Sequence, residues 1–302
     1  MTRIVPALLL ACLLGLALPA RAAVKVVSSI AALGSLAREV GGDRVSVEAL
    51  SKGYQDPHFV EAKPSLMLVL NRADLLLHVG LELEIGWLPV LVQGSRNPRI
   101  QAGEPGNLDC SQAIPVLDAP QTKVDRSMGD IHPGGNPHYW LPPDSAKALA
   151  RLIAGRLGQL DPEGKPSYQA NLKAFEARVA AKEKEWAELI GKLKGTKVAT
   201  YHKSWTYVSK WLGLEEVGYV EPKPGITPDP AHLARLIGQM KKAGSRLLLV
   251  ESYYNRGTAR LVAEKAGATL LTLPTDVGAT PEIKSWFDLV DAVLKEMAAA
   301  VK

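Results

Sequence analysis

The stretch Pro166–Leu193, "PSYQANLKAFEARVAAKEKEWAELIGKL", sets the organisation of the whole chain. Its apolar side chains recur at steps of three, four and seven, which is the spacing of an amphipathic helix. These positions are Tyr168, Leu172, Phe175, Val179, Trp186, Ile190 and Leu193. Pro166 stands at the beginning and Gly195 just beyond the end, as helix termini prefer. The pattern predicts one helix of about 28 residues, roughly 42 Å long.

Short β-branched segments alternate with helical ones on both sides of this helix. Before it lie "VKVVSSI" (24–30), "VSVEAL" (45–50) and "ADLLLHVG" (73–80), and after it "KVATYH" (197–202), "EEVGYVE" (215–221), "RLLLVES" (246–252) and "ATLLTLPT" (268–275). Such alternation is typical of parallel sheets covered by helices. We therefore predict an α/β protein with two parallel-sheet lobes, residues 23–163 and 195–302. The rigid helix at 164–194 joins them and limits their hinging, which excludes a flexible Gly/Ser linker.

The first 22 residues have the pattern of a secretory signal peptide. Arg3 precedes an apolar run from Ile4 to Pro19, and the small-residue pattern Ala20-Arg21-Ala22 predicts cleavage after Ala22. The run of about 16 residues is short for a membrane span of about 20. Cys12 lies inside it, and we favour cleavage at Ala22 over a lipid anchor on this cysteine. The mature protein is therefore expected to be exported.

Charge and cysteine content exclude some classes of protein. The formal net charge of the 302 residues is +5, and its even spread argues against a nucleic-acid partner. Beyond the signal, Cys110 is the only cysteine in the sequence, so no intramolecular disulfide can form. Stability must come from the burial of apolar residues, which make up 47 % of the chain. That is enough for two lobes, each with its own core.

Several histidines and one carboxylate follow predicted strands. His58 lies after the second strand, His202 ends "KVATYH", and Asp276 follows the last strand with Gly278 two residues on. His138 lies in the loop "GDIHPGGNPHYWL" (129–141), ahead of a predicted helix. Parallel sheets bind ligands at the carboxyl ends of their strands. Three imidazoles and a carboxylate drawn from both lobes suit tetrahedral Zn²⁺, although Cu²⁺, Co²⁺ and Ni²⁺ also accept such donors.

Five segments together resemble a known family. They are "QDPHFVEAKPS" (55–65), "NRADLLLHVGLELEIGWLPVL" (71–91), "GDIHPGGNPHYWLPPD" (129–144), "VATYHKSWTYVSKWLGL" (198–214) and "TLPTDVG" (272–278). Their order and spacing resemble those of the metal-binding solute-binding proteins of zinc and manganese ABC importers, over essentially the whole mature chain. The resemblance implies that His58, His138, His202 and Asp276 are the metal ligands, in a cleft between the lobes. Manganese members resemble this chain but carry glutamate at the His202 position, so zinc is favoured.

The resemblance also implies a role and partners. The chain is expected to be a monomeric periplasmic receptor, without enzymatic activity, that delivers Zn²⁺ to the membrane subunits of an ABC permease. A periplasmic metallochaperone is a candidate further partner. One alternative is a Mn²⁺ or Fe²⁺ receptor of the same family. The other is an exported zinc-dependent hydrolase, which would need a general base such as Glu251 or Glu61 beside an open coordination position.

The remaining polar residues have weaker interpretations. Zinc members of the family often carry a long His-rich loop, whereas "APQTKVDRSMGDIHP" (119–133) is short and holds only His132, which we expect to be an ordinary loop residue. His78 is expected to pack near a strand end and His232 to be solvated on a helix. Glu251 is either the rival of Asp276 or a hydrogen-bond partner of a ligand.

The neighbours of the two N-terminal ligands suggest how these are held. Asp56 and Glu61 flank His58 and could orient its ring. Pro137 fixes the backbone before His138 and restrains the preceding residue, which lowers the entropy cost of binding. The aromatic pair at 139–140 is expected to pack beneath that histidine.

Overall fold

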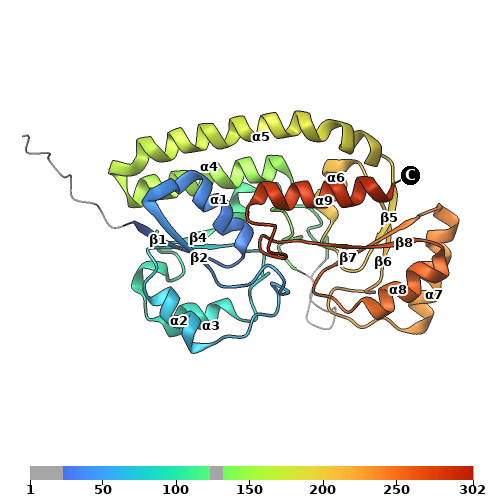
Figure 1. Ribbon diagram of the computed structural model, residues 1–302. Helices are drawn as coiled ribbons and strands as arrows, with labels where there is room; N and C mark the ends of the chain where they lie inside the picture. The colour runs from blue at the N-terminus through green and yellow to red at the C-terminus, as the bar shows by residue number, and fades with distance from the viewer. Residues whose placement is uncertain (1–22, 123–131, 302) are drawn as a thin grey trace, which may run out of the picture.

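The predicted connecting helix is α5 (Lys165–Leu193), with 29 residues. The computed structural model describes residues 23–122 and 132–301, so the predicted signal peptide and Cys12 lie outside the described residues. In Figure 1, α5 runs along one side of the molecule past both lobes. Five of its seven predicted apolar positions are buried, and Leu172 and Ile190 pack against the same core while partly exposed. The prediction of this helix is confirmed.

Residues 23–122 and 132–301 contain two parallel four-stranded sheets with the same strand order. The first has the order β2-β1-β3-β4 and the second β6-β5-β7-β8. The strands are β1 (Val24–Ser28), β2 (Val45–Ala49), β3 (Leu75–His78), β4 (Asn107–Asp109), β5 (Lys197–Thr200), β6 (Glu215–Tyr219), β7 (Leu247–Glu251) and β8 (Thr269–Leu273). All seven predicted strands are present, and β4 is an additional strand of three residues. The predicted α/β class with two parallel sheets is therefore confirmed.

Helices cover both faces of each sheet. They are α1 (Ala31–Gly41), α2 (Pro64–Asn71), α3 (Leu88–Ser95), α4 (Pro143–Leu160), α6 (Thr206–Leu212), α7 (Pro230–Ala243), α8 (Arg256–Ala266) and α9 (Trp286–Ala300), besides α5. Figure 1 shows α1, α4, α5 and α9 on one side of the two sheets, with α2 and α3 opposite in the first lobe and α7 and α8 in the second. Among the helices within the described ranges, none combines the length and apolarity of a membrane span.

The largest hydrophobic core extends through both lobes. It contains Leu77 of β3 and Leu249 of β7, together with the buried side chains of α1, α4 and α5. Two smaller cores lie on the opposite faces, one under α2 and α3 and the other under α7 and α8. The expectation that each lobe has its own core is therefore only half right, because the sheet faces toward α5 share one.

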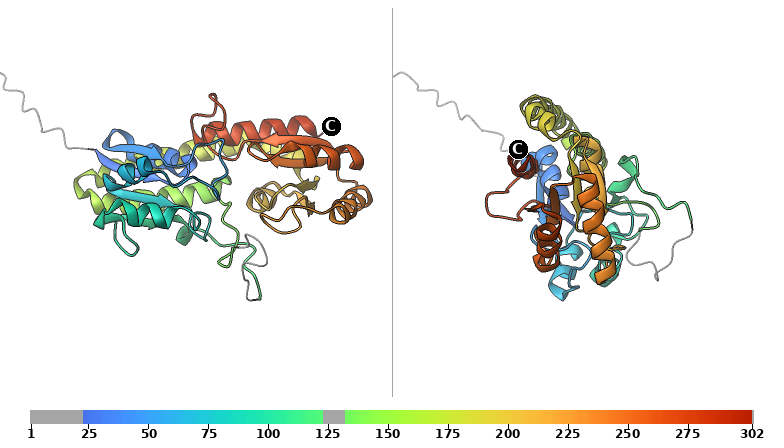
Figure 2. Two further views of the ribbon diagram at one scale, coloured as in Figure 1. Left: turned by 90° about the horizontal axis from the view of Figure 1, so that it is seen from below. Right: turned by 90° about the vertical axis from the view of Figure 1, so that its right-hand side faces the viewer.

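Helix α9 ties the second lobe to the first. It follows β8 in the chain, yet it packs against both α1 and α5. The Trp286 indole N–H donates to the Trp140 carbonyl at 2.9 Å, and the Trp286 backbone N–H donates to the Ser35 hydroxyl at 2.9 Å. Seen from below, the two lobes lie side by side, and α9 extends from the junction between them along the second lobe (Figure 2). Their relative position is thus fixed by packing as well as by one helix.

Candidate metal centre

Three of the four predicted ligands meet at one point. The ligand atoms of His58, His138 and His202 all lie within 4.8 Å of one another. The ring centroids are 5.1 Å apart for His58 and His138, and 5.2 Å apart for each of the other two pairs. All three side chains are buried. Since His202 follows β5 and the other two belong to the first lobe, the cluster lies where the lobes meet.

In each ring, Nδ1 lies within hydrogen-bond distance of a side-chain oxygen of another residue. His58 Nδ1 lies 2.7 Å from Asp56 Oδ1, and His202 Nδ1 lies 2.7 Å from Glu221 Oε2. His138 Nδ1 lies 3.0 Å from Asn136 Oδ1. A histidine that donates one ring N–H in this way presents the other nitrogen, Nε2, as a lone-pair donor to a metal. Nε2 of both His58 and His138 is buried with no hydrogen-bond partner among the described residues.

Burial favours the neutral form of two of these imidazoles, those of His138 and His202. It lowers the pKa of His138 well below the ordinary value, and the positive charges that His58 and His202 would carry act in the same direction. Burial also lowers the pKa of His202, although the hydrogen bond to Glu221 opposes the shift. A metal needs unprotonated imidazole, so at neutral pH it meets little competition from protons at these two residues.

The carboxylate partner of His58 is itself charged. Burial alone would raise the pKa of Asp56, but the hydrogen bonds and charge of His58 bring it below the ordinary value. The predicted role of Asp56 as an orienting group fits this geometry. Glu61 instead has an exposed side chain that pairs with Lys63 at 3.0 Å, so it is a surface residue.

The loop that carries His138 is held by close backbone packing. The Asn136 backbone N–H donates to the Leu117 carbonyl at 2.8 Å. Gly135 has φ +109°, and a Cβ atom there would lie 2.2 Å from a Val116 methyl carbon, so only glycine fits. Tyr139 and Trp140 are buried, and the Trp140 ring centroid lies 5.8 Å from that of His138. The expected aromatic packing beneath His138 is confirmed for Trp140.

Asn136 also joins the two lobes at the site. Its side-chain amide donates to the Lys203 carbonyl at 2.8 Å, one residue after His202. The same side chain accepts from the His138 backbone N–H at 3.0 Å. The Tyr207 hydroxyl donates to the Asn136 carbonyl at 2.9 Å. One amide therefore fixes His138 relative to the segment that carries His202.

Asp276 lies elsewhere than the three histidines. Its carboxylate is not in the group of ligand atoms within 4.8 Å of one another, counted over the residues that the structure describes. Oδ2 accepts from the Ala31 backbone N–H at 3.0 Å, and Oδ1 accepts from those of Ala32 at 2.6 Å and Val277 at 2.9 Å. Asp276 thus binds the N-terminus of α1, where the helix dipole favours an anion. Burial nevertheless raises its pKa to about 7.

Glu251 is also absent from the histidine group within the described ranges. It ends β7 and is fully buried. Burial raises its pKa to about 8, and the negative charges of Glu221 and Asp56 add to the effect. A carboxyl group that is protonated at neutral pH is a poor ligand for zinc, so Asp276 remains the better carboxylate candidate.

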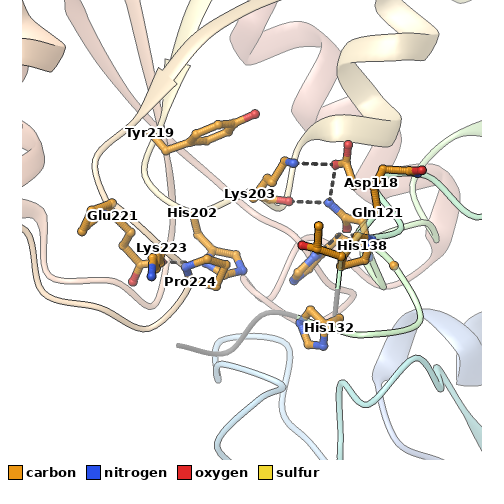
Figure 3. A pocket seen from close by; sticks show the side chains of 15 residues that line it. Asp118, Gln121, His132, His138, His202, Lys203, Tyr219, Glu221, Lys223 and Pro224 are labelled. Atoms are coloured by element: carbon orange, nitrogen blue, oxygen red, sulfur yellow. Dashed lines mark hydrogen bonds and ion pairs between the residues drawn. The ribbon is translucent and has the colours of Figure 1, made fainter. Parts of the chain in front are cut away.

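A pocket of about 420 Å³ opens onto the cluster. Figure 3 shows His138 and His202 pointing toward one another across it, with His132 below them. At its rim Lys203 forms an ion pair with Asp118 at 3.1 Å. Glu221 lines the same pocket. The sequence analysis missed Glu221, although its position at the end of the predicted strand segment 215–221 was a usable signal.

The other histidines are held by neighbours away from the cluster. His78 Nε2 lies 2.9 Å from Asn107 Oδ1 at the end of β3, as expected for a packed residue. His232 differs from its expected solvated state, because it is only partly exposed and its Nε2 lies 2.9 Å from the Tyr219 carbonyl. Cys110 is buried in the core, and burial raises the pKa of its thiol well above the ordinary value.

His132 lies against the cluster rather than free in a loop. Its ring stacks on that of His58 with centroids 5.4 Å apart, and its centroid is 6.2 Å from that of His138. Burial, together with the charges that His58 and His202 would carry, lowers its pKa to about 3. The expectation of an ordinary loop residue does not describe this position.

Two parallel-sheet lobes on one long helix, with buried imidazoles gathered where the lobes meet, define a two-lobed metal-binding receptor. A family profile described as ZnuA, zinc-uptake complex component A, periplasmic, matches residues 26–300. The chain therefore belongs to this family. It is 27 % identical over 329 residues to the high-affinity zinc uptake system protein ZnuA of Paracoccus denitrificans, with 96 % of each chain covered.

Two further relatives agree in length and fold. The high-affinity zinc uptake system protein ZnuA of Yersinia pestis is 26 % identical over 298 residues, covering 93 % of this chain and 92 % of that protein. A crystal structure of ZnuA is similar with a TM-score of 0.77 and 27 % identity, covering 93 % of this chain and all of the other. The similarity therefore extends over both lobes and the helix between them.

Proposed function

We propose that this protein captures Zn²⁺ in the periplasm and delivers it to the membrane subunits of an ABC permease. His58, His138, His202 and Asp276 are the proposed ligands. The observation that carries the proposal is the group of three buried imidazoles, whose ligand atoms lie within 4.8 Å of one another. Imidazoles that are already positioned and desolvated bind a metal at little further cost in entropy or reorganisation.

The donor set favours zinc over manganese or iron. Zn²⁺ accepts nitrogen ligands in a tetrahedral arrangement, whereas Mn²⁺ prefers oxygen. The proposed set has three nitrogens and one carboxylate. His202 is the decisive residue, because a glutamate there would give the oxygen-rich set of a manganese receptor.

Asp276 completes the set when the metal binds. A carboxylate has roughly four lone-pair positions, and the three backbone amides occupy three of them. Oδ2 accepts from Ala31 alone, so it retains capacity for a metal. The Trp140 indole N–H donates to the Thr275 carbonyl at 2.7 Å, which places the Asp276 segment beside the aromatic support of His138.

Transport suits this site better than hydrolysis does. A catalytic zinc needs an open coordination position and a free general base beside it. The carboxylates nearest the cluster are already engaged, Asp56 with His58 and Glu221 with His202. Glu61 is paired with a lysine at the surface, and Glu251 is buried and protonated. The proposed receptor works as a monomer after cleavage at Ala22, loaded directly or by a metallochaperone.

Metal content gives the direct test. Protein purified without chelator should contain about one zinc per chain, and manganese should compete poorly for the apoprotein. Zinc should also stabilise the fold, by about 4 kcal/mol at a thousandfold excess over Kd, because it binds only the folded state. An unchanged melting temperature in saturating zinc would refute the site, while preferential binding of manganese would move the protein to the oxygen-ligand branch of the family.

A further inference from the structure

His132 meets the requirements of a metal ligand although it lies at the edge of the three-histidine group. Its Nε2 atom is buried with no hydrogen-bond partner among the residues described. The Leu81 carbonyl accepts a hydrogen bond from its ring, and since Nε2 is unpartnered this bond must come from Nδ1. The arrangement matches that of His58, His138 and His202, in which a neighbour holds Nδ1. A free, desolvated Nε2 is then available to a metal.

The residue that holds the His132 ring has an unusual backbone. Leu81 has φ +51° and Glu82 has φ +63°, and Gly80 before them has φ +78°. Non-glycine residues seldom adopt left-handed conformations, and two in succession point to a functional constraint. Here that backbone directs the Leu81 carbonyl at His132. The backbone N–H groups of Val79 and Gly80, just before Leu81, donate to the buried Glu84 carboxylate at 2.7 and 3.2 Å and so fix this segment.

A tight turn connects His132 to the segment that carries His138. The Gly135 backbone N–H donates to the His132 carbonyl at 3.0 Å and closes a four-residue turn with Pro133 at its second position. Proline there fixes φ and stiffens the turn. The Cβ of any larger residue at 134 would lie 2.9 Å from a Leu81 methyl carbon, so the turn packs directly on the segment that holds the ring. His132 is thereby positioned from two sides.

Asp276 and His132 are the two candidates for the fourth zinc ligand, and each would have to change in a different way to bind the metal. Asp276 must share a carboxylate that already accepts three amide hydrogen bonds. His132 offers an unpartnered nitrogen but must move inward, because its ring centroid is 5.4 Å from that of His58. We infer that His132 is an alternative fourth ligand, which binds zinc through Nε2 while Asp276 remains on the N-terminus of α1. This inference rests on the proposed zinc-binding function.

An exchange between these two ligands would give the site two loaded forms. One has four nitrogen donors and the other three nitrogens and one oxygen, and both suit tetrahedral Zn²⁺. In the four-nitrogen form the metal is held without disturbing the contact between Asp276 and α1. Each ligand can therefore substitute for the other when one is removed.

A double-mutant cycle on the full mature protein tests the exchange, with zinc affinity measured by competition with a chelator. The variants are His132→Gln, Asp276→Asn and their combination, and His232→Gln in both backgrounds is the matched control. Each single change should weaken zinc binding by less than about tenfold, because the other residue fills the position. The combination should weaken it by more than the product of the two single effects, and by at least about a hundredfold.

X-ray absorption of the zinc-loaded proteins separates a ligand from a merely structural residue. Asp276→Asn should retain four imidazole ligands, and the double variant should retain three. The inference is overturned if His132→Gln affects zinc affinity in the Asp276→Asn background no more than His232→Gln does. Wild-type protein that binds no zinc would instead overturn the proposed function itself. His132→Ala, checked for folding by circular dichroism, serves as a second variant.

Discussion

The three histidines and Asp276 present opposite situations to an incoming metal ion. Asp56, Asn136 and Glu221 hold the imidazoles in place, and two of the three have an unpartnered Nε2. The Asp276 carboxylate already accepts three backbone amides, two of them from α1 of the other lobe. One part of the site is therefore prepared for metal before it arrives, whereas the other must exchange an existing interaction. Zinc affinity should therefore depend mainly on the three histidines and less on Asp276.

Removal of a prepared ligand should have the largest effect. His202→Ala leaves a gap that water fills, and zinc affinity is expected to fall by at least about a hundredfold, or roughly 2.7 kcal/mol. Competition titration against a zinc chelator measures it, with His78→Ala as a control outside the cluster. If His202→Ala changes affinity less than tenfold, His202 is not a ligand, and the prepared imidazoles do not determine zinc affinity.

Replacement of the same ligand by an oxygen donor should alter selectivity. His202→Glu is expected to weaken zinc binding by about tenfold and to raise the affinity for manganese, because a hard oxygen replaces a borderline nitrogen. The structure adds a complication, since the new carboxylate would face Glu221, which now accepts from the His202 ring. His202→Glu combined with Glu221→Gln should therefore shift the zinc-to-manganese ratio further than His202→Glu alone. Parallel titrations with the two ions compare the variants.

The residues that orient the prepared ligands should matter less than the ligands themselves. Glu221→Gln keeps a hydrogen-bond acceptor beside His202 but removes its charge, and about a tenfold loss of zinc affinity is expected. Glu216→Gln on β6, the strand that precedes Glu221, is the matched control, because Glu216 accepts from the Ser209 and Tyr219 hydroxyls instead. Equal losses in the two variants would show that Glu221 contributes only general charge.

The smallest effect on affinity, with a distinct pH signature, should come from Asp276. Its pKa is raised to about 7 in the folded protein, so the folded state keeps a proton that the unfolded state loses near pH 4. The stability that this proton confers is complete below pH 4 and is lost as pH rises through 7. Apoprotein with Asp276→Asn should avoid this loss, which amounts to roughly 2 kcal/mol between pH 5 and 8.

Urea unfolding of both apoproteins at the two pH values measures the difference. Other buried groups titrate in both proteins, among them Glu251 in the same direction and His132 in the opposite one, so their effects cancel in the comparison. Zinc affinity of Asp276→Asn should fall only a few-fold, because the prepared histidines remain. Identical pH dependence in the two proteins would contradict the raised pKa.

The fold was predictable because local patterns determine most of it. The spacing of apolar residues in α5 and the β-branched strand segments are features of neighbouring residues, which a sequence displays directly. The strand β4 (Asn107–Asp109) was missed because three residues are too few to show a pattern. The shared core was missed for a different reason, since the packing of α9 against α1 depends on segments far apart in the chain.

The site was predictable to the extent that its residues are ligand types at strand ends. His58, His138 and His202 meet those conditions, and the structure brings them together. The contact of Asp276 with the N-terminus of α1 spans 245 positions of the chain, and no local signal announces it. The role of Leu81 depends on a left-handed backbone that its residue type does not predict. Sequence patterns thus identified candidate metal ligands, but not the residues that each ligand contacts in the folded protein.

The core that runs through both lobes determines how this protein could serve as a zinc sensor. Fluorophores attached to the outer ends of the two lobes would report little by energy transfer, because a continuous layer of buried side chains under α5 and α9 keeps that separation constant. Splitting the chain within α5 for a complementation assay would expose that layer in both fragments and favour aggregation. An environment-sensitive dye beside the pocket at Lys203 would instead report on the local exchange of ligands.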